Sequence, residues 1–117
     1  MKKLARFLSA ALSSALILGA MAGCGGGEKS EVFLIGCTGP LTGDASSYGI
    51  SVKQGASLAV EEINANGGLE GVKFEFDMKD DKATAEDANT GYDALYDAGM
   101  KISIGGVTSG SCAAIAE

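Results

Sequence analysis

Residues 32–37 read Val-Phe-Leu-Ile-Gly-Cys, and this short run decides the fold class. It contains no charged side chain, which is typical of a strand buried on both faces. Residues 38–44 follow with two glycines and the single proline of the chain, and this composition indicates a loop. Strands buried on both faces occur in parallel sheets that helices cover on each side. The run therefore predicts an α/β fold.

A long helix is predicted after the loop, from Ser47 to Asn66. Apolar residues recur there at steps of three and four, while the opposite side is mostly polar. The sequence Asn66-Gly67-Gly68 should end the helix, because these residues accept a left-handed backbone. The predicted apolar stripe is Tyr48, Val52, Ala56, Ala59, Val60 and Ile63, and the predicted polar side is Lys53, Ser57, Glu61, Glu62 and Asn64.

Two further strands and two further helices are predicted downstream. Residues 72–79 alternate apolar and charged side chains, as in a strand near a sheet edge. Thr84 should cap the next helix, with Asp87 in the capping-box position and Gly99 at the end. Residues 101–107 form the third predicted strand, and residues 108–111 begin the last helix. The stripe expected in the second helix is Ala88, Tyr92, Leu95 and Ala98.

Strands therefore alternate with helices along residues 32–117. Parallel strands require such crossovers, which are almost always right-handed. We predict a three-layer α/β unit with a parallel sheet. Because the sequence stops at Glu117, where a helix has just begun, we also expect it to be part of a longer protein.

Ligands of open α/β sheets bind beyond the carboxyl ends of the strands, where the strand order switches. Residues 37–48, 80–84 and 107–111 are expected there. In the last of these segments, Ser109 and the amides of Gly110 and Ser111 would suit a carboxylate at a helix N-terminus. Ordinary N-capping explains the same residues and is the simpler interpretation of them alone.

Other chemical sites are weaker in this sequence. The glycines at 36–43 do not have the spacing of a phosphate-binding loop. Asp80 and Asp81 allow a metal site or a phosphate acceptor, although a solvated strand end is favoured. Tyr48 is either a core aromatic or a pocket wall. The chain has no histidine, which excludes a Ser-His-Asp triad and histidine metal ligands. No cofactor or metal is expected.

The N-terminal residues read as an export signal. Lys2, Lys3 and Arg6 precede an uncharged apolar stretch, as in a secretory signal over residues 1–23. The ending Met-Ala-Gly-Cys resembles a bacterial lipobox, which implies lipidation of Cys24 and a tether over residues 24–30. A transmembrane anchor is the alternative, since residues 7–27 are long enough to span a bilayer.

Charge and cysteine content limit the partners. Without the signal, 6 basic residues remain against 15 acidic ones, a net charge of −9. Nucleic acid binding requires clustered basic residues, so nucleic acid is not an expected partner. Cys37 and Cys112 either pair in an oxidising compartment or remain as buried thiols, and the thiols are favoured.

The segment 31–117 resembles the start of the leucine/isoleucine/valine-binding family of ABC-transporter substrate-binding proteins, which have the periplasmic binding protein type 1 fold. The stretch from Leu58 to Gly71 is the most specific part. The resemblance implies two lobes that close on an amino acid, with only the first part of the N-terminal lobe present here. The residues that carry it are Ile35–Gly36, Gly39–Gly43, Tyr48–Gly49, Gly55, Leu58–Gly68, Gly71, Asp80–Asp81, Ile104–Gly105 and Ser109.

The same resemblance implies roles for individual residues. Ser109, with the main chain of Val107 and Thr108, would hold the ligand carboxylate, and Tyr48 would wall the side-chain pocket. Some family members have a disulfide between the loops that match Ala83 and Thr108, and neither residue is a cysteine here.

The expected function is a lipid-anchored, non-enzymatic binding protein outside the cytoplasmic membrane. It would deliver a branched-chain or related amino acid to an ABC permease. A ligand-sensing domain of the same fold, coupled to a receptor, is the alternative. An exported α/β enzyme is a third and weaker interpretation.

Overall fold

The computed structural model describes residues 32–117. The predicted signal peptide, the lipidation of Cys24, the tether and the alternative membrane anchor all lie outside the described residues. The helices within residues 32–117 are all too short or too polar to cross a membrane.

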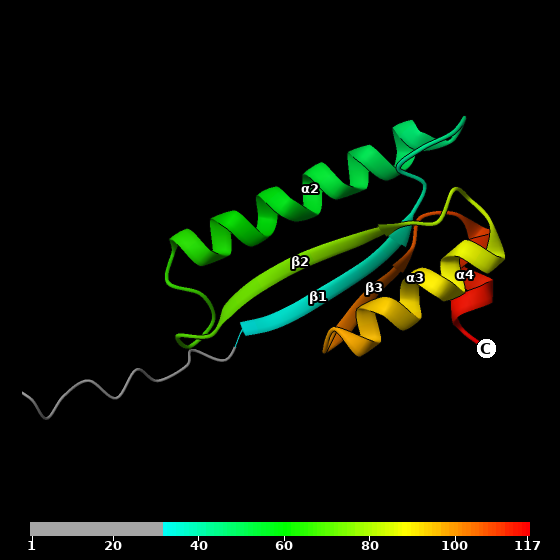
Figure 1. The fold of residues 1–117 in the computed structure, drawn as a ribbon. Helices are drawn as coiled ribbons and strands as arrows, with labels where there is room; N and C mark the ends of the chain where they lie inside the picture. The colour runs from blue at the N-terminus through cyan, green and yellow to red at the C-terminus, as the bar shows by residue number, and fades with distance from the viewer. Residues whose placement is uncertain (1–31) are drawn as a thin grey trace, which may run out of the picture.

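Strands and helices alternate along the described chain, as predicted, and the three strands are parallel. The strand order is β2-β1-β3, which places β2 at an edge of this sheet. The elements are β1 (Val32–Gly39), α2 (Ser46–Ala65), β2 (Lys73–Asp80), α3 (Ala85–Asp97), β3 (Ile102–Gly106) and α4 (Ser109–Ile115), shown in Figure 1.

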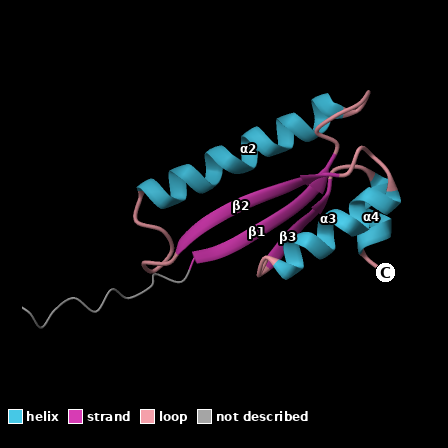
Figure 2. Ribbon diagram, in the orientation of Figure 1, coloured by secondary structure: helices cyan, strands magenta, loops and turns pink. Residues whose placement is uncertain are grey.

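Helix α2 lies on one face of the sheet, and α3 and α4 lie on the other (Figure 2). The strand order explains this arrangement. The chain moves from β1 to β2 in one direction across the sheet and returns past β1 to reach β3. Right-handed crossovers in opposite directions place their helices on opposite faces. The predicted three-layer α/β architecture is confirmed.

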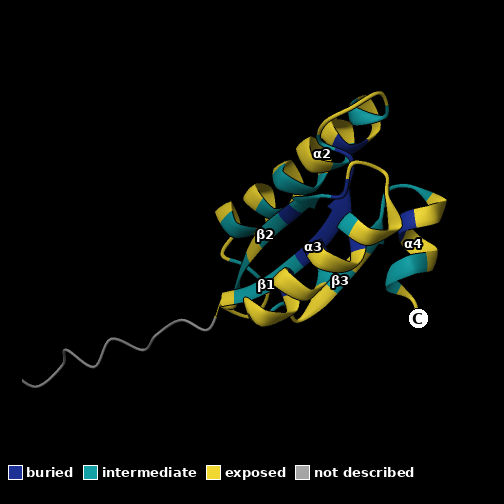
Figure 3. Cartoon of the chain, turned by 45° about the vertical axis from the view of Figure 1, so that its right-hand side comes forward, coloured by how far each residue is buried: buried dark blue, intermediate teal, exposed yellow. Residues whose placement is uncertain are grey.

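Burial is deepest in the carboxyl-terminal half of β1 (Figure 3). Cys37 and Thr38 are essentially inaccessible there, and Leu95 of α3 is also fully buried in the core. The amino-terminal half of β1 is more open, and Val32 is exposed. The prediction of a strand buried on both faces is therefore correct for the half of β1 that leads to the predicted ligand-binding loops.

The predicted helix ends are confirmed. The Thr84 hydroxyl accepts a hydrogen bond from the Asp87 amide at 3.1 Å and caps α3. Gly99 follows α3 with a φ of 89°, and Gly67 follows α2 with a φ of 102°. Both values lie in the left-handed region that glycine accepts without a Cβ penalty.

Part of the predicted helix packing is wrong. In α3 the buried residues are Ala88, Gly91 and Leu95, while Ala98 is exposed. Tyr92 is half-buried, and the neighbouring Gly91 is fully buried because α3 lies very close to β2. A Cβ on Gly91 would come within 2.9 Å of the Lys79 Cβ.

Helix α2 also differs from the prediction. Half of its predicted stripe is half-buried (Val52, Ala56 and Val60), and Gly49 is the one fully buried residue of this helix. Tyr48, Ala59 and Ile63 of the predicted stripe are exposed. Asn64, expected on the polar side, instead forms two hydrogen bonds to the backbone of Phe74 in β2. Apolar periodicity cannot predict that an asparagine side chain on a helix forms hydrogen bonds with the backbone of an edge strand.

Candidate functional site

The carboxyl ends of β1 and β3 form a topological switch point. The two strands are neighbours, but β1 leads to α2 on one face and β3 leads to α4 on the other. The loops 40–45 and 107–108 therefore diverge from adjacent strands. We call this junction the switch point, and it is the position at which open α/β sheets bind ligands.

The segment 107–111 contains a complete helix cap. The Thr108 hydroxyl accepts a hydrogen bond from the Ser111 amide at 3.4 Å and donates one to the Ser111 Oγ at 2.9 Å. Ser111 is fully buried, whereas Ser109 and Gly110 are exposed. The N-capping interpretation is thus confirmed for Thr108. Contact of the ligand with Ser109, Gly110 and Ser111 stays a prediction, and the Ser111 amide and hydroxyl already have a partner in Thr108.

Val107 joins the two strands of the switch point. It directly follows β3, and its amide donates to the Thr38 carbonyl of β1 at 3.1 Å. A Cβ on Gly39 would overlap the Val107 side chain, so glycine is required at the end of β1. The expected contact of the Val107 and Thr108 main chain with a ligand carboxylate remains a prediction.

Tyr48 lies in the first turn of α2, on the other side of the switch point. Its side chain is 69% exposed, so the core-aromatic interpretation is wrong. The next residue, Gly49, is buried against the backbone of Pro40, and a Cβ on Gly49 would overlap the Pro40 carbonyl group. This close approach seats the start of α2 on loop 40–45. The pocket-wall role of Tyr48 stays a prediction.

Asp80 is a partly exposed strand end, as the sequence favoured, but its carboxylate is also hydrogen-bonded to the chain. Its Oδ1 accepts hydrogen bonds from the amides of Leu41 at 2.8 Å, Lys82 at 3.0 Å and Thr42 at 3.4 Å. Its Oδ2 accepts one from the Thr42 hydroxyl at 2.6 Å. We call this group of four interactions the Asp80 cluster. It connects the end of β2 to loop 40–45.

The Asp80 cluster changes the acidity of the carboxyl group. The slight burial of Asp80 raises its pKa, but the hydrogen bonds from the Thr42 hydroxyl and the three amides have the larger combined effect. They lower the pKa from 3.8 to about 2. Hydrogen bonds donated to a carboxylate stabilise its charged form. Asp80 is therefore ionised at any pH at which the protein is expected to work.

Asp81 is fully buried, so the expectation of a solvated strand end is wrong for this residue. Its Oδ1 accepts from the Ala83 amide at 2.8 Å, and its Oδ2 has no hydrogen-bond partner. Ala83 and Lys82 both have a left-handed backbone, with φ of 60° and 48°. Asp80 and Asp81 each accept from the amide two residues on, as in Asx turns. The acidic pair thus shapes a tight turn.

Within residues 32–117, no three acidic, cysteine or histidine side chains are grouped so that they could hold a metal ion. The sequence signal that could identify the turn is the pair of acids directly after a strand, followed by a helix cap. The two left-handed residues that follow are not glycines, so no glycine indicates the turn in the sequence.

The two described cysteines are free thiols. Cys37 is buried, and its thiol donates to the Gly105 carbonyl at 3.3 Å. Burial raises the pKa of Cys37 to about 11, with smaller contributions from Asp81 and Cys112. Cys112 is exposed and donates to the Gly106 carbonyl at 2.9 Å. The preference for thiols over a disulfide agrees with the structure, but the expected burial of Cys112 is wrong.

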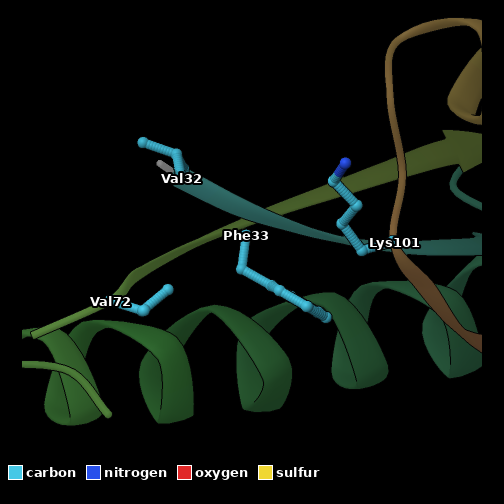
Figure 4. A pocket seen from close by; sticks show the side chains of 4 residues that line it. All are labelled: Val32, Phe33, Val72 and Lys101. Carbon is cyan, nitrogen blue, oxygen red and sulfur yellow. The ribbon is translucent and has the colours of Figure 1, made fainter. Parts of the chain in front are cut away.

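A pocket of about 250 Å³ lies at the opposite end of the sheet (Figure 4). It is lined by Val32, Phe33, Val72 and Lys101, at the amino ends of the strands. Three of the four side chains are apolar, and Phe33 points toward α2. The pocket lacks the converging polar groups that fix a small ligand in a binding site. Because it lies at the amino ends of the strands, this pocket is separate from the switch point.

The parallel sheet, the three layers and the diverging loops define an α/β protein of the class that binds small ligands at a switch point. Residues 33–117 match the family described as "Periplasmic binding protein". The chain belongs to this family.

Named relatives refine the family. The chain is 38% identical over 76 residues to the Leu/Ile/Val-binding protein BraC3 of Rhizobium johnstonii, covering 65% of this chain and 21% of the relative. It is 32% identical over 82 residues to the leucine-, isoleucine-, valine-, threonine- and alanine-binding protein of Pseudomonas aeruginosa, covering 70% and 22%. The chain thus spans about a quarter or less of the length of these relatives, and the predicted resemblance is confirmed.

A solved structure shows the same likeness. The branched-chain amino acid transporter substrate binding protein LivJ of Streptococcus pneumoniae, crystallised with isoleucine, superposes with a TM-score of 0.66 at 33% identity. The match covers 72% of this chain and 24% of that protein. An extracellular ligand-binding receptor from Verminephrobacter eiseniae has a TM-score of 0.69 at 20% identity, over 74% of this chain and 24% of that one. The second likeness supports the fold alone.

Proposed function

We propose that the complete protein is a substrate-binding lipoprotein that works outside the cytoplasmic membrane and delivers branched-chain or related amino acids to an ABC importer. It is a binding protein and not an enzyme. The observation that carries the proposal is the exposed Ser109, which follows β3 at the switch point. Relatives named for binding leucine, isoleucine and valine support the ligand class.

Ser109 is suited to the carboxylate of an amino acid. It is the first residue of α4, directly after the cap residue Thr108, and its side chain is not tied to the cap. Helix N-termini favour negative charge, and a serine hydroxyl donates to a carboxylate oxygen. Tyr48 would contact the ligand side chain from the α2 side of the switch point. The group that pairs with the ligand ammonium is expected in the second lobe.

Calorimetric titration of the complete protein with leucine, isoleucine and valine tests the ligand class. We expect binding of at least one of the three, and weaker binding of the matching amino alcohol, which lacks the carboxylate. The variant Ser109→Ala should lose about tenfold in affinity, in the range of one hydrogen bond to a charged group. Ser51→Ala, on the exposed surface of α2, is the matched control. Failure to bind any of the three amino acids would contradict the proposal.

The membrane anchor is tested separately. Lipidation at Cys24 would attach the protein stably, because two or more acyl chains anchor where one does not. We expect Cys24→Ser to move the protein from the membrane fraction to the soluble fraction and to abolish labelling by radioactive palmitate. Ligand affinity should not change, since the predicted binding lobe begins at residue 31. Unchanged labelling in Cys24→Ser would contradict the anchor assignment.

The importer partner is tested by uptake. Deletion of the gene should remove high-affinity uptake of the amino acid that the purified protein binds. Restoration of uptake by the wild type, but not by Ser109→Ala at limiting ligand concentration, would support delivery to a permease. Normal uptake in the deletion strain would contradict this partner.

A further inference from the structure

We infer that Asp80 is a positioning residue for ligand binding, although it lies on a strand that does not border the switch point. Its carboxylate fixes loop 40–45, and through this loop it sets the position of Tyr48. The inference rests on the proposed function, because it concerns the same amino acid site. Asp80 itself would not touch the ligand.

The first step is the place of Asp80 in the sheet. It is the last residue of β2 and pairs with Gly39, the last residue of β1. Strand β1 separates β2 from β3, so Asp80 is one strand removed from the switch point. Its carboxylate nevertheless reaches the loop that follows β1, through Leu41 and Thr42.

The second step is how few other bonds hold this loop. The other backbone hydrogen bonds of residues 40–48 outside the regular elements are local, from Ser46 to Gly43 and from Tyr48 to Ala45. The amides of Leu41 and Thr42 and the Thr42 hydroxyl all donate to Asp80. Among the described residues, the ionised side chain of Asp80 thus provides the hydrogen bonds that connect this loop to the rest of the lobe.

The third step connects the loop to Tyr48. Pro40, which precedes Leu41, is fully buried and contacts Gly49 so closely that a Cβ there would overlap its carbonyl. A shift of the loop therefore moves the first turn of α2. Tyr48 lies in this turn with an exposed side chain. Its ring would change position relative to the ligand with no change in any residue that contacts the ligand.

Two pairs of variants of the complete protein test the inference. Asp80→Asn keeps the shape of the side chain and removes its charge and one acceptor oxygen. Asp77→Asn is the matched control, because Asp77 lies on the same strand in a surface ion pair with Lys79. Thr42→Val removes the hydroxyl donor, whereas Thr42→Ser retains it. Each variant is measured by isoleucine titration, by amide hydrogen exchange and by thermal unfolding.

We expect Asp80→Asn to exchange the Leu41 and Thr42 amides about tenfold faster and to bind isoleucine at least threefold more weakly, since it loses charge-assisted hydrogen bonds. Thr42→Val should weaken binding in the same direction, and Thr42→Ser and Asp77→Asn should match the wild type. Unchanged isoleucine affinity in Asp80→Asn would overturn the inference. The inference would also be overturned if Asp80→Asn and Asp77→Asn both lost isoleucine affinity in proportion to their loss of thermal stability.

The two proposals fail in different ways. If the wild type binds none of the amino acids, the proposed function is wrong and the role of Asp80 in ligand binding is wrong with it. If the wild type binds isoleucine and Asp80→Asn binds it equally well, the proposed function stands and the positioning role of Asp80 is refuted.

Discussion

The side chain of Asn64 binds both backbone groups of Phe74. Its Nδ2 donates to the Phe74 carbonyl at 2.7 Å, and its Oδ1 accepts from the Phe74 amide at 2.9 Å. This amide extends the hydrogen bonding of β2, which is an edge strand of the described sheet and has no further strand beside it there. Asn64 therefore fixes the last turn of α2 to the start of the edge strand.

Replacing Asn64 by alanine should reduce the free energy of unfolding by about 1–3 kcal/mol, because two partly buried backbone groups lose their partner. Asn89→Ala is the matched control. Asn89 is exposed in the middle of α3, so its replacement should change stability by less than about 0.5 kcal/mol. Urea unfolding of the complete protein measures both values. Equal effects of the two substitutions would contradict the role of Asn64.

Two glycines of α2 should respond oppositely to alanine. Gly49→Ala should destabilise by about 1–3 kcal/mol, because the new methyl group overlaps the backbone of Pro40. At Gly55 the same change meets no atom within 4 Å and should stabilise by about 0.5–1 kcal/mol through helix propensity. Thermal unfolding of the two variants decides this. A stable Gly49→Ala protein would show that loop 40–45 is not pressed against α2.

The order of elements and the helix ends follow from local sequence. Thr84 with Asp87, and Gly67 and Gly99, encode their caps within a few residues, so the sequence alone predicts them correctly. The candidate site is less predictable. The hydroxyl-rich segment 108–111 indicates an N-cap, and the structure assigns the cap to Thr108. Three interactions of the Asp80 cluster join Asp80 to Leu41 and Thr42, which lie 39 and 38 positions away, and no local pattern indicates such contacts.

Burial was predicted less well for a related reason. Periodicity indicates which side of a helix is apolar, but not how closely that helix approaches the sheet. Gly91 is buried because α3 lies against Lys79, a contact between elements that sequence spacing does not reveal. Asp81 shows the same limit, because its burial depends on a turn of two left-handed non-glycine residues.

This turn provides a third prediction. Ala83 has a φ of 60°, a conformation that costs an L-residue roughly 1 kcal/mol and glycine almost nothing. Ala83→Gly should therefore leave stability unchanged or raise it by up to about 1 kcal/mol. Ala94→Gly, at an exposed position inside α3, should lower it by about 1 kcal/mol. Chemical unfolding compares the pair, and a similar loss in both would argue against a left-handed Ala83.

The buried thiol gives a fourth prediction. The pKa of Cys37 is raised from 9.0 to about 11, so at pH 8 its thiolate fraction should be about 100-fold below that of an unperturbed cysteine. Iodoacetamide should therefore leave Cys37 unmodified in the folded protein and alkylate it in guanidinium chloride. Peptide mass spectrometry locates the label, with Cys112→Ser as the background that removes the exposed thiol. Rapid labelling of native Cys37 would contradict its burial.

The last prediction concerns the pKa of Asp80 and the pH dependence of stability that follows from it. Its folded pKa of about 2 lies below the unfolded value of 3.8, so its contribution to stability is fully present above about pH 4 and is lost as the pH falls toward 2. The shift comes from hydrogen bonds and not from an ion pair, because the described salt bridges join Lys79 to Asp77 and Lys82 to Asp87. We therefore expect the pKa of Asp80, followed by carboxyl NMR, to change little between low and high salt. Thr42→Val should raise this pKa toward 3.8, whereas Thr42→Ser should leave it near 2. A salt-sensitive pKa, or one that is the same in both variants, would show that charge pairing rather than loop 40–45 holds the carboxylate.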